Sequence, residues 1–562
     1  MTRVFSQILV EGPTSAIEHL RALYAAQRSS TPDEELVSCI QAVAHRLCAP
    51  AKDGTLFSGE LWRACISSEL LILLLEIIGD PFFTSGPEFW VASVLLCLNG
   101  ILEPWWLYED SDPQYRPPEI KPVLPEQGQL EHMFSVLRPA WQNLWDHIDD
   151  LLDPTVGAIL GTPAHVLALL ASMTGDMLGL CGLYRNRIAN TEDKMRVLLD
   201  VEFIPVMLFT WTHSNLCGGP GHSESLHEIP LRMDEYRASI EEVATTLAEG
   251  PGGDAMQVYW NEKVDKAIAR IGPPKIIEAF RIILEESGLW LVDKILISHL
   301  KELSLLLSTG LAHHTQLREA FWEQPMTAAL HAVCMRAYRQ TMAHQGARHF
   351  LAWCKHCCDL LGVVGEGVAR GFCTEIYGSH LGIMFSNFCV VGVSGLPTVF
   401  EGDETQVETL DELCSSLCTV TTRWCEVIRE SSNGHDVNPD VERLVLQLRL
   451  SSEKAWYPTL QAMRLMQDTM GRESKERTGR YIQCWVDLGN TLGLDEMTER
   501  VQFEASRTRL CSWRACAYYR ECAKEALPVC KGCGAARYCS RECQRKDWKE
   551  GNHKMKCRRL KT

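Results

Sequence analysis

Apolar residues recur at three- and four-residue steps along most of the chain before residue 505. One such stripe would line a single helix face, and it consists of Leu289, Val292, Leu296, Leu300, Leu303 and Leu307. The same spacing predicts helices over 14–28, 60–79, 88–102, 130–152, 163–184, 191–210, 231–249, 256–270, 317–344, 347–362, 407–431 and 477–505. We therefore expect an all-α body over residues 1–505.

Two further stretches bear on the helix assignments. Thr-Pro-Asp-Glu-Glu at 31–35 is typical of a helix start, and it predicts Thr31 at the N-cap with Pro32 following. Residues 441–450 fit both a strand and a helix, because alternate leucines suggest the first and a three- to four-residue apolar spacing suggests the second. Helical neighbours on both sides favour a helix.

Connections between the helices are predicted where proline, glycine and acidic residues gather. These are 104–129, 213–230 and 391–406, and the Gly365-x-Gly367-x3-Gly371 pattern is interpreted as a loop or a helix start. An all-helical body of this length is expected to stack helical hairpins into an irregular, armadillo-like α-solenoid. A helical bundle is the alternative.

Charge is distributed unevenly along the 562 residues. The whole chain has a formal charge of −17, whereas residues 507–562 alone carry 16 basic and 5 acidic groups, or +11. The remaining 506 residues therefore carry −28, since −17 minus +11 is −28. An acidic body with a basic C-terminal end excludes a nucleic-acid-binding surface that covers the whole protein.

The 24 cysteines are interpreted in the light of the cellular compartment. The chain starts without a sustained apolar signal segment, and no apolar run reaches the roughly 18–20 residues that a membrane span needs. We expect an intracellular protein with reduced thiols and no membrane contact, in the nucleus or the cytoplasm. In that setting clustered cysteines indicate a metal site.

Nine cysteine and histidine residues lie from Cys511 to Cys557, and eight of them fall into four short-range pairs. The pairs are Cys511 and Cys516, Cys530 and Cys533, Cys539 and Cys543, and His553 and Cys557. Each pair can supply two ligands from one tight turn or one helix face. Eight ligands complete two tetrahedral sites and leave no position for a catalytic water, so we expect two structural Zn²⁺ ions.

The segments around these residues resemble the MYND finger signature. They read Tyr538-Cys539-Ser540, Cys543-Gln544 and Asp547-Trp548, followed by His553 and Cys557. The resemblance implies a small cross-braced fold over 507–562, and chains of this kind, with a long helical body before the finger, are familiar from fungi. It implies one zinc ion on Cys511, Cys516, Cys539 and Cys543, and the other on Cys530, Cys533, His553 and Cys557.

This sequence departs from the usual MYND spacing in two places. Four residues separate Cys511 from Cys516 where two are usual, and Cys522 is left as an alternative to either ligand. Four residues also separate Trp548 from His553, where the turn-forming Gly551 and its neighbour can accommodate the insertion.

MYND fingers bind short proline-containing peptides, and the positions that match the binding surface here are Gln544 and Trp548. The resemblance therefore implies an adaptor that recruits proteins. Packing is the alternative role for Trp548. Nucleic-acid binding by the basic end is a second hypothesis, disfavoured because that end offers no obvious recognition helix or row of stacking aromatics.

An enzyme hidden in the helical body is a third hypothesis, and the sequence gives it no support. The Asn-His-Ser-Cys turn of SET methyltransferases is absent. Cys354, Cys357 and Cys358 lie in a helical run and are interpreted as buried thiols. A third metal site from His213, Cys217, His222 and His227 matches no known ligand spacing. We expect no catalytic residues.

Overall fold

The computed structural model describes most of the chain, with short gaps inside several ranges. The described residues are 2–47, 64–110, 127–153, 166–177, 201–217, 252–285, 300–307, 315–333, 348–370, 381–389, 404–433, 439–468 and 472–557. Helices dominate these residues, and the one β-type pairing among them is a bridge between Val529 and Arg537. The all-α class is therefore confirmed. Among the described helices, none is long and apolar enough to cross a membrane.

Two compact units divide the chain, residues 1–324 and residues 325–562. The helices of the first unit are α1 (Thr2–Glu11), α2 (Pro13–Gln27), α3 (Glu34–Leu47), α5 (Leu70–Ile78), α6 (Trp90–Asp110), α7 (Gln127–Asp146), η1 (Ile148–Leu152), α10 (Phe203–Cys217), α12 (Gly252–Ile271), α13 (Pro273–Glu285) and α15 (Thr315–Glu323).

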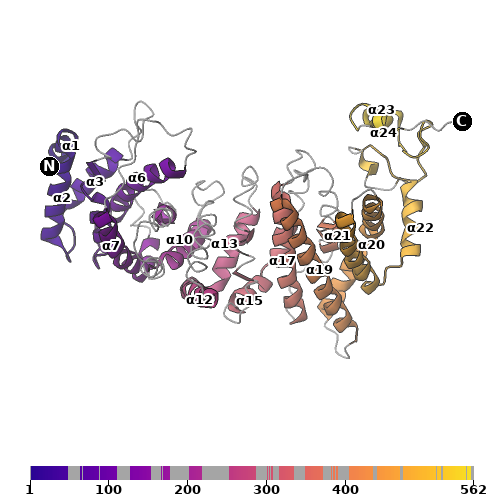
Figure 1. Cartoon of the computed structure of the whole chain (residues 1–562), viewed down its shortest axis with the longest axis horizontal. Helices are drawn as coiled ribbons and strands as arrows, with labels where there is room; N and C mark the ends of the chain where they lie inside the picture. The colour runs from indigo at the N-terminus through magenta and orange to yellow at the C-terminus, as the bar shows by residue number, and fades with distance from the viewer. Residues whose placement is uncertain are drawn as a thin grey trace. The chain divides into compact units, whose positions relative to one another are not determined.

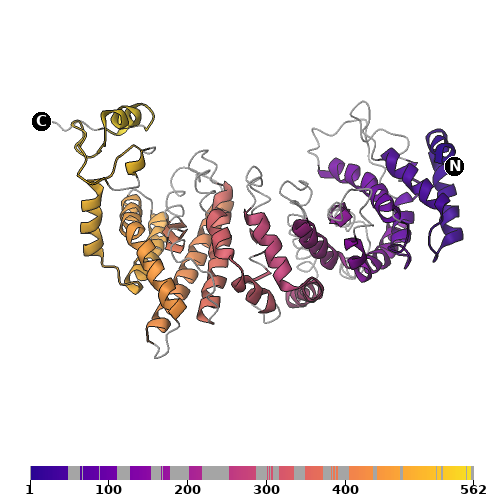
Figure 2. The ribbon, with the colours of Figure 1, turned by 180° about the vertical axis from the view of Figure 1, so that it is seen from behind.

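Helices of the first unit pack on helices that are near them in sequence. α1 contacts α2 and α3, α5 contacts α7, and α10 contacts α12 and α13, as the two opposite views in Figures 1 and 2 show. Aromatic rings fill the interior between them, and the ring centroids of Trp211 and Phe280 lie 4.5 Å apart. Packing between sequence neighbours is the arrangement that stacked helical hairpins produce.

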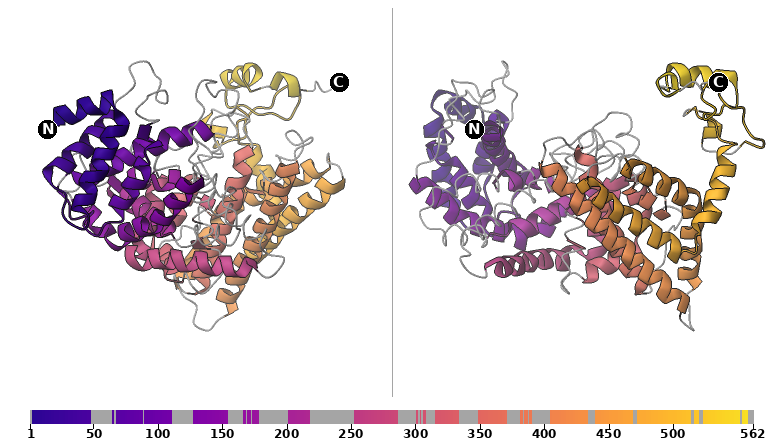
Figure 3. Two further views of the ribbon diagram at one scale, coloured as in Figure 1. Left: turned by 60° about the vertical axis from the view of Figure 1, so that its left-hand side comes forward. Right: turned by 45° about the vertical axis from the view of Figure 1, so that its right-hand side comes forward.

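The second unit continues this pattern and ends in the cysteine-rich segment. Its elements are α17 (Arg348–Ala369), α19 (Glu404–Asn433), α20 (Pro439–Gln467), α21 (Arg472–Thr491), α22 (Glu496–Arg507), η5 (Ala517–Tyr519), α23 (Arg541–Lys549) and α24 (His553–Lys556). α17 packs on α19, α19 on α21, and α20 on both α21 and α22. The right-hand view of Figure 3 shows α22 leading from these helices into the C-terminal segment.

Several predicted helix boundaries are wrong. The helix predicted over 317–344 is interrupted at Gln324 and Pro325, because proline lacks the N–H that a continuous helix needs. The helix predicted over 477–505 is two helices, separated by a turn in which Gly493 has a φ of 72°. The predicted start at Thr31 is displaced as well, since the Asp33 carboxylate accepts the Leu36 N–H at 2.9 Å and caps α3.

Two predicted loops begin with residues that are still helical, and the glycine pattern interpreted as a loop or a helix start falls at the end of a helix. α6 continues through Pro104 to Asp110, and α10 continues through His213 to Cys217. Gly365 and Gly367 belong to the last turns of α17, where a Cβ on Gly365 would stand 3.2 Å from the Trp424 indole nitrogen, and Gly371 lies outside the described residues. In α10 and α17 side-chain packing keeps the chain helical where the local sequence favours a loop, since His213 is buried and Gly365 lies against Trp424.

Other expectations are confirmed or lie outside the described residues. α20 settles the ambiguous segment as helix, with Val441, Leu444 and Leu448 buried. Cys354, Cys357 and Cys358 are buried on α17, as expected. The predicted helix 231–249, the residues Leu289, Val292 and Leu296, and the positions His222 and His227 lie outside the described residues.

Candidate metal centre

The cysteine-rich segment follows α22 directly. Asp495 caps this helix by accepting the Thr498 N–H at 2.8 Å, and the ring of Phe503 contacts Tyr457 of α20 at a centroid distance of 5.7 Å. Immediately after the helix, the carbonyl of Thr508 accepts the N–H of Leu527 at 2.7 Å. The cysteine-rich segment is therefore hydrogen-bonded to the C-cap residue of α22.

A short hairpin positions the second cysteine pair. Cys530 donates its N–H to the Ala536 carbonyl at 2.7 Å, and Tyr538 donates to the Pro528 carbonyl at 3.1 Å. The tip turns back through Gly534, whose φ is 65° and whose N–H bonds the Cys530 carbonyl at 2.8 Å. Glycine adopts this left-handed backbone without a steric cost, so Cys530 and Cys533 can face one point.

Gly532 makes room for a third ligand at the same point. A Cβ on Gly532 would stand 3.0 Å from the Cys557 sulfur and 3.7 Å from the Cys530 sulfur. Any larger residue would therefore displace the sulfur atoms that must meet here.

The helix α23 fixes Cys543 through its cap. Ser540 is the N-cap, and its Oγ accepts the Cys543 N–H at 3.1 Å. Cys539 precedes this cap and lies outside α23, so this pair of ligands is supplied by the cap region and not by one helix face. In α24 the His553 carbonyl accepts the Cys557 N–H at 2.8 Å, which keeps that last pair within one turn.

These elements bring the eight predicted ligands into two groups of four, each with all ligand atoms within 4.8 Å of one another. The groups are Cys511, Cys516, Cys539 and Cys543, and Cys530, Cys533, His553 and Cys557. In the first group the sulfur of Cys539 lies 3.4 Å from that of Cys516 and 3.5 Å from that of Cys543. In the second, the sulfur of Cys533 lies 3.8 Å from the His553 Nε2.

Such separations suit Zn²⁺. A tetrahedron with Zn–S bonds of about 2.3 Å has sulfur atoms about 3.8 Å apart, and the Cys530 and Cys557 sulfurs are 4.0 Å apart. The groups alternate along the chain, which is the cross-braced arrangement. Their eight ligands fit two zinc ions, with the coordination of each completed by protein.

The clustered thiols of each ligand group need a bound cation in order to ionise together. Burial, followed by hydrogen bonds with Cys516 and Cys543, raises the pKa of Cys539 to about 12. A neighbouring thiolate opposes the ionisation of the next thiol, and a divalent ion removes that obstacle by binding the thiolate form. Zinc binding therefore displaces protons from the sulfur atoms.

Comparison with known proteins identifies this segment. A family model described as MYND finger matches residues 516–557. Residues 516–557 form a MYND finger. No curated protein matches the chain, so the likeness to fungal chains stays a prediction.

A search of solved structures finds a similar chain titled "Circular tandem repeat protein with novel repeat topology and enhanced subunit contact surfaces". It shares 16% sequence identity over 90% of this chain and 98% of that chain, with a TM-score of 0.24.

The first ligand of the MYND finger lies before the matched region. Cys511 is five residues ahead of Cys516, where the match begins, and its N–H bonds the Tyr518 carbonyl at 2.7 Å. That bond folds the 511–518 segment back on itself, so the unusual spacing still delivers both sulfurs to one site. The alternative ligand Cys522 lies outside the described residues.

The MYND finger has a small core, with most of the zinc ligands packed in it or against it. Its buried apolar residues are Cys511, Ala523, Leu527, Cys530 and Tyr538. Other large apolar side chains of the finger face solvent, with Val529 and Trp548 each 41% exposed. So little apolar burial cannot hold a fold of this size, and the metal must contribute its stability.

One buried hydrogen bond was not foreseen from the sequence. Tyr538 donates its hydroxyl to the Asp547 carboxylate at 2.6 Å, and both side chains are buried. Burial and then this bond raise the pKa of Tyr538, which keeps it protonated. Gly551 is needed here too, because a Cβ would stand 1.8 Å from an Asp547 carboxylate oxygen. In the sequence, this bond could have been suspected from the tyrosine and the aspartate that lie nine positions apart in the finger.

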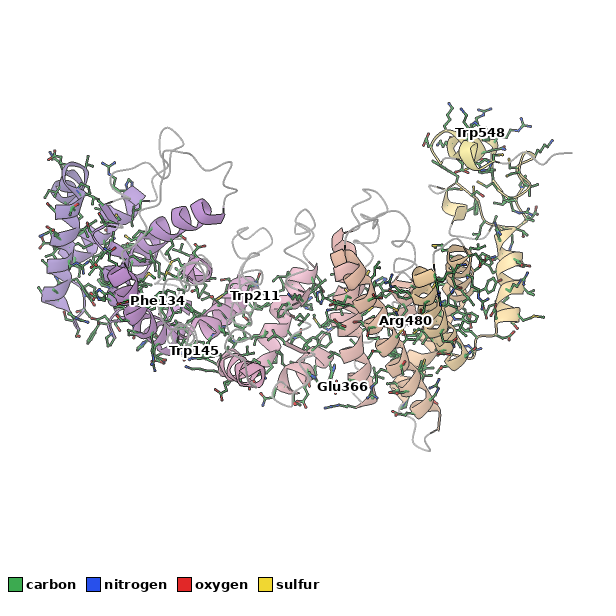
Figure 4. The ribbon with its side chains drawn as sticks, viewed as in Figure 1. Phe134, Trp145, Trp211, Glu366, Arg480 and Trp548 are labelled. Carbon is green, nitrogen blue, oxygen red and sulfur yellow. The ribbon has the colours of Figure 1, made fainter. Side chains whose placement is uncertain are left out.

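The two positions proposed to bind peptide lie on α23. Trp548 packs against the zinc ligand His553 with ring centroids 5.8 Å apart and an interplanar angle of 64°, yet remains 41% exposed. Figure 4 shows it at the outer side of the finger. Gln544 is half-buried, one turn earlier on the helix. Trp548 is therefore both packed against His553 and open to solvent.

A cavity of about 630 Å³ lies on a different face of the second unit, between the end of α22 and the finger. Arg507, Ser512, Arg537 and His553 are among its lining residues, whereas Gln544 and Trp548 are not. His213 and Cys217, the described members of the alternative metal set, belong to no ligand group among the residues searched. Burial lowers the pKa of His213 to about 4, as expected for a core histidine.

Proposed function

We propose that this protein recruits partner proteins by binding a proline-containing peptide on the α23 face of its MYND finger. The observation that carries the proposal is the state of Trp548, which is held against His553 and still 41% exposed. An aromatic ring that is held by a neighbouring side chain and still partly exposed can contact a proline ring. Little side-chain entropy is lost when a ligand binds such a ring.

The neighbouring side chains define the rest of the peptide. The Gln544 amide can pair with a peptide backbone, one turn away from the indole. Arg541, Arg545 and Lys549 are exposed on the same helix, and their charge favours a peptide with acidic residues beside its proline. Both zinc sites have full protein coordination, so peptide binding needs no ligand exchange at the metal.

A peptide-binding assay tests this proposal. Full-length, zinc-loaded protein is applied to an array of proline-containing peptides, and the strongest peptide is titrated by calorimetry. Trp548→Ala should weaken binding by about 1–2 kcal/mol or more, as loss of an aromatic contact does, with the zinc content unchanged. Tyr518→Ala is the matched control, because Tyr518 is another exposed aromatic of the finger, 43% exposed, outside α23.

Two outcomes would overturn the proposal. Binding that survives Trp548→Ala and Gln544→Ala would place the peptide elsewhere. Binding of duplex DNA or single-stranded RNA with a steep salt dependence, unaffected by Trp548→Ala, would favour the nucleic-acid hypothesis instead.

We further propose that the protein has no catalytic activity of the SET methyltransferase kind. Its zinc sites have four protein ligands each, which is the mark of structural zinc. Radiolabelled S-adenosylmethionine with histone and peptide substrates should give no signal. Dose-dependent methyl transfer that a substitution within residues 1–505 abolishes would contradict this proposal.

A further inference from the structure

Two cysteines of adjacent helices approach each other closely in the second unit. The sulfur of Cys418 on α19 lies 2.8 Å from the sulfur of Cys484 on α21. A disulfide has a sulfur–sulfur bond of about 2.05 Å. The two thiols are thus within a small side-chain rotation of bonding distance, although they are far apart in sequence.

The surrounding contacts hold the two helices in this register. Arg477 of α21 pairs with Asp411 of α19 at 2.7 Å, and the Tyr481 hydroxyl donates to the Leu410 carbonyl at 3.4 Å. Both contacts lie within two turns of the cysteine pair and join the same two helices. Figure 4 labels Arg480, one turn before Cys484. The approach of the sulfurs is therefore supported by independent contacts.

Two properties of the pair indicate its chemistry. These are the exposure of the two thiols and the number of potential metal ligands beside them. Cys418 and Cys484 are both partly exposed, whereas the other cysteines of α17 and α19 are buried. Among the described residues, groups of three or more potential metal ligands occur only in the MYND finger, so this pair has no third ligand. Two accessible thiols without a metal partner are suited to oxidation.

We propose that Cys418 and Cys484 are a modification site, where a peroxide forms a reversible disulfide that joins α19 to α21. The site is separate from the zinc ligands and from the peptide-binding face.

The reaction proceeds in two balanced steps. The Cys484 thiolate attacks hydrogen peroxide, an S–O bond forms, the O–O bond breaks, and hydroxide leaves, which gives a sulfenic acid. The Cys418 thiol then attacks the Cys484 sulfur, the S–S bond forms, and the S–O bond breaks. The Cys418 proton joins the departing hydroxyl group to give water. Peroxide is reduced by two electrons, and a thiol reductant reverses the disulfide by exchange.

The order of the steps follows from the contacts of Cys418. A hydrogen bond with Cys414 lowers the pKa of Cys418, but the bond with Cys484 and burial outweigh it and raise that pKa to about 11. Cys418 therefore keeps its proton at neutral pH, which assigns it the second step.

Peptide mapping of the full-length, zinc-loaded protein tests the proposal. The protein is treated with hydrogen peroxide, alkylated, digested without reduction and analysed by mass spectrometry. A linked peptide containing Cys418 and Cys484 should appear and vanish on reduction with dithiothreitol. Mapping separates this product from any oxidation of the finger cysteines. Cys425→Ser is the matched control, since it removes another buried thiol of α19, two turns from Cys418, and should leave the linked peptide unchanged.

Two further results decide the matter. In Cys484→Ser, Cys418 should remain alkylatable after peroxide treatment, and the rise in Tm that oxidation gives the wild type should be absent. The proposal is overturned if both wild-type thiols stay fully alkylatable while the finger cysteines oxidise, or if Cys418 becomes linked to Cys414 instead.

Discussion

Trp456 and Trp485 donate their indole N–H groups to each other's backbone carbonyl. Each bond is 2.8 Å long, and both side chains are 1% exposed. The pair joins α20 to α21 and satisfies two buried donors that would otherwise cost stability. Because each indole reaches the backbone of the opposite helix, the spacing of these helices depends on the small residues around the rings.

Gly489 is the residue that makes room for Trp456. A Cβ at this position would stand 2.1 Å from the indole ring, so Gly489→Ala should displace the ring and break the bond to Trp485. Overpacking in a core costs about 1–3 kcal/mol. We expect a lower Tm, measured by calorimetry.

Gly479→Ala is the control for this substitution, since Gly479 lies on the same helix and its Cβ would meet only the Gln467 side-chain nitrogen at 3.4 Å. This change should be neutral or stabilising, by up to about 1 kcal/mol, because alanine favours helices. Equal effects of the two variants would contradict the packing explanation.

Glu499 predicts a pH dependence of stability. It is buried on α22, and burial followed by the charge of Glu453 raises its pKa. The folded protein thus disfavours the ionised form of Glu499. Its contribution to the free energy of unfolding therefore falls as the pH rises through this pKa. Glu499→Gln should therefore raise the Tm at pH 7, and the gain should shrink as the pH falls. Glu504→Gln, exposed on the same helix, should show no such gain.

Gly532→Ala should weaken the second zinc site selectively. The added Cβ would press on the Cys557 sulfur, 3.0 Å away. Competition with a chromophoric chelator should show one zinc ion released earlier than in the wild type and the other unchanged. Early loss of both ions would mean that the sites are not independent.

The ligand assignment of the first site predicts different results for neighbouring cysteines. Cys511→Ser or Cys516→Ser should remove one zinc ion of two, because each removes a ligand from that group. Cys522→Ser should leave two. Inductively coupled plasma mass spectrometry of purified variants gives the count, and loss of zinc from Cys522→Ser would require a new assignment.

A strong chelator should unfold the MYND finger while the helical body survives. Structural zinc contributes roughly 10–16 kcal/mol of apparent binding free energy in such modules, and the finger core contains none of the body's residues. Circular dichroism should keep most of its helical signal, and proteolysis should attack the finger alone. Loss of the entire helical signal would mean that finger and body share one core.

The sequence was sufficient for the helical class and for the zinc ligands, for different physical reasons. Helix periodicity reports burial of one face, and it identified α20 despite its alternating leucines. Few residue types bind zinc, so the eight ligand positions could be predicted from the sequence without knowledge of the structure. Helix ends were less predictable, because α6 continues through Pro104 and α10 through His213. The end of α10 depends on packing that local propensity does not encode, since His213 and Asn215 are buried there.

Side-chain pairs across helices were beyond the sequence altogether. Nothing in the local pattern indicates that Cys418 meets Cys484, or that Trp456 meets Trp485, since each pair depends on the register of two helices. The bond between Tyr538 and Asp547 was not predicted either, although these two residues are only nine positions apart in the sequence.

The hydrogen bonds that Thr508 and Arg509 accept from Leu527 and Ala523, at 2.7 and 2.9 Å, mean that the MYND finger cannot be excised at its first cysteine. A fragment that begins at Leu510 would lack both acceptors and leave two N–H groups of the finger unpaired. An expression fragment should therefore begin within α22 or earlier. Any homologue that carries the finger on a different helix must supply these two carbonyls anew.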